Sequence, residues 1–131
     1  MNIKRQLKND YIDKIRKYFI KYMDNNKCYC DICGCEDNLT VHHDTMLSDI
    51  FVMAKEELGI SNKVHYTSDK HILTQQECRN LRDVCLRIQR EEIKFRILCE
   101  DCHRDLHREK DFNYNSHKGK TFKEWMNNVD K

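Results

Sequence analysis

The sequence predicts a small α+β fold, in which a short β-sheet is surrounded by helices. LTVHH (39–43) contains β-branched residues, and IKFRILC (93–99) alternates apolar and basic side chains as a half-buried strand does. Several longer stretches repeat apolar residues at helical intervals. Two Cys-x-x-Cys pairs, one before the first predicted strand and one at the end of the second, could join these segments. Because the chain has no proline, three glycines and no linker-like stretch, we expect residues 1–131 to form a single domain.

The N-terminal segment, residues 1–27, is expected to form a basic helix. Residues 10–23 place apolar side chains at helical spacing, namely Tyr11, Ile12, Ile15, Tyr18, Phe19, Tyr22 and Met23. Lys14, Lys17 and Lys21 lie off this stripe. The segment has eight Lys/Arg against three Asp/Glu, a net charge of +5, whereas residues 28–107 have ten against fifteen, a net charge of −5. Such a basic face is either simply solvated or in contact with a polyanion such as nucleic acid.

Residues 44–92 are expected to form a helical insert between the two strands. Its first helix is predicted in SDIFVMAKEELG (48–59). Ser48 would be the N-cap, and Gly59 would lie just past the C-terminal end.

The second helix of the insert is predicted over residues 74–92, where Thr74 and Glu77 have the spacing of a capping box. Its apolar stripe includes Cys78 and Cys85, which we interpret as buried apolar residues and not as metal ligands. The same capping pattern, with Thr121 and Glu124, predicts a short helix carrying Trp125 within a C-terminal loop and helix, residues 111–131.

The cysteine content is best explained by metal binding. No apolar run approaches the length of a membrane span, and the N-terminus MNIKRQLKND has no apolar stretch after its basic residues. We therefore expect a cytoplasmic protein with no membrane association. In a reducing compartment, eight cysteines favour a metal site over a disulfide framework.

Four of the cysteines are the predicted ligands of a structural zinc ion. Cys30 and Cys33 form one pair, Cys99 and Cys102 form another of identical spacing, and together they would complete a tetrahedral site. Cys28 and Cys35 flank the first pair and are alternative ligands. We prefer Cys30 and Cys33 because Gly34 follows them, as the tight turn of a knuckle requires.

The histidines predict a second metal site. His103 and His107 are four residues apart and would share one face of a helix, although two surface histidines on a charged helix are the simpler alternative. His42 and His43 are adjacent in the predicted strand. Strand alternation would send them to opposite faces, unless the strand ends there and both reach one cleft. Asp44 could orient one imidazole through its second ring nitrogen.

Taken in order, these elements resemble the HNH endonucleases, whose core is the ββα-metal motif, or His-Me finger. CDIC followed by Gly34 is similar to the first zinc knuckle of that family, and LTVHH to its first strand with the signature histidine pair. CEDCHRDLH (99–107) is similar to the second knuckle and the metal-binding helix. The resemblance implies a ββα-metal core formed by residues 28–43 and 93–110. It extends to phage-encoded HNH proteins, some of them homing endonucleases, which have a helical insert and a loop containing asparagines, here Asn113 and Asn115.

The resemblance also implies residue roles. His43 corresponds to the general base, and His42, His103 and His107 correspond to the ligands of a catalytic divalent ion, Mg²⁺, Mn²⁺ or Ni²⁺. The implied activity is hydrolysis of DNA phosphodiester bonds to 5′-phosphate and 3′-hydroxyl products, with one strand nicked by each active site. Two features depart from the family pattern. The gap from His43 to Cys99 is long, and no asparagine lies near Lys94, where the family places its middle asparagine.

The expected partner is double-stranded DNA, bound by a monomer or homodimer in the cytoplasm. If the protein is encoded by a phage, this is the cytoplasm of the bacterial host. Candidate contacts to DNA are Lys14, Lys17, Lys21, Arg96, Lys118 and Lys120. Two alternatives stay open: a catalytically inactive, zinc-stabilised DNA-binding module, and a small protein that binds another protein. We favour the nuclease, because neither alternative needs four histidines around one point.

Overall fold

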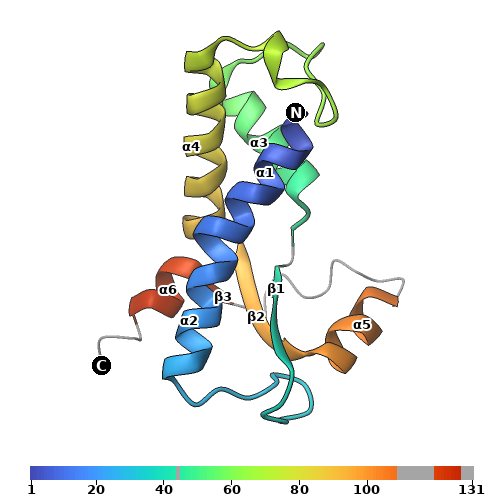
Figure 1. The fold of residues 1–131 in the computed structure, drawn as a ribbon, viewed down its shortest axis with the longest axis vertical. Coiled ribbons are helices and arrows are strands. Elements are labelled where there is room, and N and C mark those ends of the chain that lie inside the picture. The colour runs from blue at the N-terminus through green and yellow to red at the C-terminus, as the bar shows by residue number, and fades with distance from the viewer. Residues whose placement is uncertain (44, 109–119, 128–131) are drawn as a thin grey trace.

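The computed structural model describes residues 1–43, 45–108 and 120–127. Figure 1 shows a small sheet whose one face is covered by the long N-terminal helix, while a short helix follows directly from the central strand. The insert projects from one end of the sheet and carries a helical pair. The described elements are α1 (Ile3–Tyr11), η1 (Ile12–Arg16), α2 (Lys17–Asn25), β1 (Leu39–His43), α3 (Leu47–Leu58), η2 (Lys70–Ile72), α4 (Gln75–Glu91), β2 (Lys94–Cys99), α5 (Glu100–Arg108), β3 (Lys120–Thr121) and α6 (Phe122–Asn127).

The N-terminal helix lies within the predicted residues 1–27 and contains a π-helical turn, η1, between α1 and α2. Asn2 caps its start, with its side chain accepting a hydrogen bond from the Arg5 backbone at 2.8 Å. The predicted apolar stripe is partly wrong. Ile12 and Tyr18 are exposed, and the buried stripe begins earlier in the chain, with the members Ile3, Leu7, Ile15 and Phe19. The extra residue in the π turn shifts the face that points at the core.

Within the described residues the sheet has the strand order β1-β2-β3, and both pairings are antiparallel. β2 was expected to be half-buried, but it is buried on both faces. On one face Phe95 packs against Phe19 of α2, with ring centroids 5.0 Å apart. On the other, Leu98 packs with Leu106 of α5. A central strand between two layers has no solvated face, which is why the basic residue within it is also buried.

The two insert helices form as predicted, with one difference. Met46, and not Ser48, precedes the first turn of α3, and no side chain caps that helix. Gly59 ends α3 in the left-handed region, at φ 66°, where a glycine is favoured. α4 begins with the predicted capping box of Thr74 and Glu77.

The C-terminal helix packs against the main core. Thr121 and Glu124 form the predicted reciprocal cap of α6. Trp125 donates a hydrogen bond from Nε1 to the Phe95 carbonyl at 3.3 Å and lies edge-on to Tyr22. Within the described part of the chain, no helix has the length and apolar character that a membrane crossing requires.

Candidate functional site

The cysteine site is formed where the two Cys-x-x-Cys turns meet. One ligand atom from each of Cys30, Cys33, Cys99 and Cys102 lies within 4.8 Å of the others. Cys33 Sγ and Cys99 Sγ, from different turns, are 3.7 Å apart. Tetrahedral Zn–S bonds of about 2.3 Å place neighbouring sulfurs about 3.8 Å apart, so the spacing fits a zinc thiolate site. The four cysteines predicted from sequence are therefore together and could bind a structural metal.

The two turns are built alike. In the first, the backbone N–H of Cys33 donates to Cys30 Sγ at 3.5 Å, and in the second that of Cys102 donates to Cys99 Sγ at 3.4 Å. Gly34 has φ 78° and donates to the Cys30 carbonyl at 2.9 Å, so the turn uses the glycine as the sequence predicted. Backbone donors aimed at sulfur stabilise thiolates, which are the form that binds a metal.

The pKa values of the first thiols in each turn follow from these contacts. Burial opposes ionisation of Cys30, but backbone donors from Cys33, Cys99 and Ile32 outweigh it and lower its pKa to about 6. The pKa of Cys99 is also lowered, chiefly by the Cys102 backbone N–H. The proposed ligands thus include two thiols whose pKa values are lowered, and a lower pKa favours the thiolate form that binds a metal.

The other cysteines have different environments. Cys28 packs against the main core, and Cys85 is fully buried there. Cys78 is partly buried and contacts the Lys70 carbonyl at 3.5 Å. Cys35 lies beside the metal-ligating cluster, and its Sγ contacts the Asp37 carbonyl at 3.6 Å. Within the described residues the metal-ligating cluster consists of the preferred four, without Cys28 or Cys35.

The histidine pair lies at the end of β1, and strand alternation is retained there. His42 is opposite Arg96 in the register and His43 is opposite Phe95. His42 is buried and its ring lies 5.1 Å from that of His103 on α5. His43 faces the N-terminal helix, where Tyr11 contacts it edge-on at 5.1 Å between ring centroids.

Because β1 ends at His43, both histidines nevertheless border one cavity of about 420 Å³. The N-terminal helix, β1 and α5 each contribute to its wall. The polar and aromatic lining residues are Tyr11, Arg16, Thr40, His42, His43, Glu100, His103 and Arg104. His107 lies one turn further along α5, but its side chain is outside the described part of the structure. With metal–nitrogen bonds of about 2.1 Å, two imidazoles on one ion have centroids roughly 5 Å apart, so the His42–His103 spacing is compatible with a shared metal.

His43 is oriented by the backbone of the segment that follows it. Its Nδ1 lies 2.7 Å from the Thr45 carbonyl oxygen. Because a carbonyl oxygen only accepts, this contact favours the proton on Nδ1 and the lone pair on Nε2. In the HNH family, which the sequence resembles, the middle asparagine supports the loop behind the catalytic histidine. In this chain the Thr45 carbonyl orients the His43 ring.

Arg96 does not lie where a DNA contact would need it. Its guanidinium is only 7 % exposed, and Nε and Nη2 both lie 2.7 Å from Asp31 Oδ2. Asp31 is inside the first cysteine turn, and its backbone N–H donates to the Ile97 carbonyl at 2.9 Å. Arg96 therefore ties the cysteine turn to the central strand, and we remove it from the set of DNA contacts.

The lysines predicted to contact DNA have varied positions. Lys14, Lys17 and Lys21 are exposed on the N-terminal helix. Lys120 is exposed on β3, with Nζ 5.4 Å from the Trp125 ring centroid. Lys118 and the loop asparagines, Asn113 and Asn115, lie outside the described residues.

Sequence reasoning missed six residues of the histidine cavity, namely Tyr11, Arg16, Thr40, Val41, Glu100 and Arg104. Tyr11 directly precedes the π-helical turn, and Arg16 is its last residue. No sequence pattern predicts this turn. Arg104 follows His103 directly and could have been inferred from helical periodicity.

No protein-family model, curated protein or solved structure matches this chain.

Proposed function

We propose that this protein is a metal-dependent endonuclease of the HNH type, which nicks DNA. The observation that carries the proposal is the cavity at the end of β1, which gathers His42, His43 and His103 between Arg16 and Arg104. The chain order β1, β2 and α5, with one cysteine turn before β1 and the other where β2 meets α5, supports the proposal because a ββα-metal motif would have this order. An open, polar cavity next to a closed cysteine cluster fits the division between catalytic and structural metal sites.

His42, His103 and His107 are the proposed ligands of the catalytic divalent ion. When bound, that ion would supply positive charge to a nonbridging phosphate oxygen and to the leaving 3′ oxygen. The zinc ion proposed for the cysteines would have no chemical role and would hold β1, β2 and α5 together.

His43 is the proposed general base. With its proton on Nδ1, its Nε2 accepts a proton from the attacking water, as the oxygen of that water bonds to phosphorus. The P–O3′ bond breaks, and the leaving oxygen takes a proton from solvent. The products are a 5′-phosphate and a 3′-hydroxyl. Arg16 and Arg104 lie at the cavity wall, where guanidinium groups would pair with phosphate oxygens.

A plasmid-nicking assay tests the proposal. Supercoiled plasmid and DNA from the source genome are incubated with the protein in Mg²⁺, Mn²⁺ or Ni²⁺, beside a control without metal. We expect metal-dependent open circles, with His43→Ala reducing the rate by about 10²- to 10⁴-fold, the usual contribution of a general base. His65→Ala is the matched control, because His65 is an exposed histidine that lines neither the histidine cavity nor any other described cavity.

His43→Ala must keep its zinc content and circular dichroism spectrum for this result to count. The absence of cleavage on both substrates in every metal would contradict the nuclease. DNA binding without cleavage would then favour the catalytically inactive binding module, whose supporting observations are the basic N-terminal helix and the absent asparagine.

A further inference from the structure

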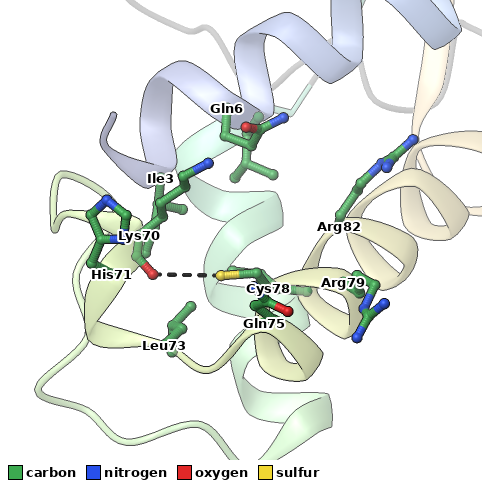
Figure 2. A pocket seen from close by; sticks show the side chains of 11 residues that line it. Ile3, Gln6, Lys70, His71, Leu73, Gln75, Cys78, Arg79 and Arg82 are labelled. Atoms are coloured by element: carbon green, nitrogen blue, oxygen red, sulfur yellow. Dashed lines mark hydrogen bonds between the residues drawn. The ribbon is translucent and has the colours of Figure 1, made fainter.

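A second cavity lies in the insert region, separate from the histidines. It is a groove of about 460 Å³ between α1, η2 and the first half of α4. Figure 2 shows side chains from these three elements around it, with Arg79 and Arg82 on α4 and Lys70 on the opposite side. Its polar lining consists of Gln6, Lys70, His71, Gln75, Arg79 and Arg82. Leu7 and Leu81 are among the apolar residues of its floor.

The groove has an excess of positive charge. Three of its lining residues are Lys or Arg, and none is Asp or Glu. Within the part of the chain that the structure describes, neither Lys70 nor Arg79 has a carboxylate oxygen within 4.0 Å of its charged group. Both charges are thus available to an anion from outside the chain.

Two acids near the groove leave Lys70 and Arg79 without a described carboxylate partner. Asp10 lies 3.9 Å from Arg82 and pairs with it, and burial raises the pKa of its carboxyl. Asp69 lies 3.9 Å from His71 and 3.8 Å from the N-terminal ammonium group, so it is shared between two partners. Neither acid is part of the groove wall.

Arg87, further along α4, has carboxylate partners among the described residues, unlike Arg79. Arg87 has three carboxylate partners within 4.0 Å, from Glu57, Glu91 and Glu92. Its charge is satisfied within the protein. Arg79, at the groove end of the same helix, has no such carboxylate partner in the described part of the chain and instead contacts the Gln76 side-chain oxygen.

We propose that this groove binds the phosphodiester backbone of the DNA that flanks the cleaved bond. The proposal depends on the proposed function, because it takes duplex DNA as the ligand. The cations would pair with phosphates and the apolar floor would contact deoxyribose. The N-terminal helix contributes Gln6 to the groove and Arg16 to the histidine cavity. Ten helical residues span roughly 15 Å, or about four to five base pairs of B-DNA, so one duplex is long enough to reach both.

The test measures the salt dependence of DNA binding. The His43→Ala protein, with its zinc and without other divalent metal, is titrated onto a fluorescent duplex of about 30 base pairs at several salt concentrations. The groove variant adds Lys70→Ala and Arg79→Ala. The matched control adds Lys63→Ala and Arg87→Ala, which removes the same two charges from the same loop and helix but outside the groove.

We expect the groove variant to lower the slope of log K against log salt by about 1.8, since each phosphate contact contributes about 0.9. The control should leave the slope unchanged. Equal effects of the two variants, or no effect of either, would overturn the proposal. The groove variant should keep the melting temperature of the parent, because neither Lys70 nor Arg79 has a described ion pair to lose, whereas the control loses the ion pairs of Arg87.

A mononucleotide competitor separates a polymer site from a small-anion site. If the groove variant loses AMP binding and yet keeps the parent's slope of log K against log salt for DNA, the groove binds a small anion, and the proposal is wrong. If the His43→Ala parent binds no duplex at all, the proposed function fails and this inference fails with it. If the parent binds and the groove variant matches the control, the inference alone fails.

Discussion

The cysteine cluster and the histidine cavity both use residues from the first turns of α5, such as Cys102 and His103, but they differ in compactness and in the chemistry of their side chains. The cysteine cluster is compact, with four sulfurs within 4.8 Å and backbone donors aimed at two of them. The histidine cavity holds about 420 Å³ of space, and its wall combines imidazoles, arginines and a tyrosine from three elements. One arrangement leaves no position for a substrate, and the other leaves room for one.

Under the proposed function, the cysteine cluster would stabilise the fold and the histidine cavity would carry out the chemistry. A closed site with all ligands from the protein stabilises a fold, whereas an open site keeps positions for water and substrate. The two are joined by the Asp31–Arg96 ion pair, which connects the first cysteine turn to the residue opposite His42. Substitutions in the two sites should consequently have opposite profiles in stability and activity.

The largest expected effect is the loss of the cysteine site. Cys102→Ser removes one of four ligands, and we expect the free energy of unfolding to fall by at least about 4 kcal/mol, because metal binding and folding are coupled. Thermal unfolding followed by circular dichroism and a zinc assay measure this. Cys35→Ser is the control and should keep about one zinc ion per chain. If Cys102→Ser keeps its zinc and melting temperature, the cluster is not a structural metal site.

An intermediate effect is expected at the link between the sites. Asp31→Asn removes the charged partner of buried Arg96, and we expect a loss of about 1–2 kcal/mol, limited because Asp31 is half exposed. Chemical unfolding in urea measures it. Asp37→Asn, an exposed acid in the same segment, should change stability by less than about 0.5 kcal/mol. Equal stability of the two variants would show that the ion pair does not hold the turn to the strand.

The smallest effect is expected at the cavity wall. Burial raises the pKa of Tyr11 to about 12, against the lowering effect of Arg16, so its hydroxyl stays protonated through neutral and mildly basic pH. Tyr11→Phe keeps the edge-on contact to His43, and we expect the nicking rate to change by no more than a factor of roughly two to three. The pH profile should also keep its shape up to about pH 10. A large loss or a shifted profile would give the phenol a direct role in the reaction.

Local sequence patterns were sufficient for the parts of this protein that depend on neighbouring residues. The cysteine ligands, the glycine of the first turn, the capping boxes of α4 and α6, and the strand LTVHH follow from spacing over two to five residues. The preference for Cys30 and Cys33 over Cys28 and Cys35 also followed from one local requirement, a residue with positive φ.

Burial, ion pairs and cavities that involve distant segments of the chain were determined by the tertiary structure alone. Arg96 looked like an exposed strand residue, but β2 lies between two layers and Asp31 pairs with it from 65 residues away in sequence. The π-helical turn that brings Tyr11 and Arg16 to the histidines, and the groove of unpaired cations between α1 and α4, also lack a local signature. Periodicity reports which residues share a face, whereas the layer that covers that face is determined by packing between elements.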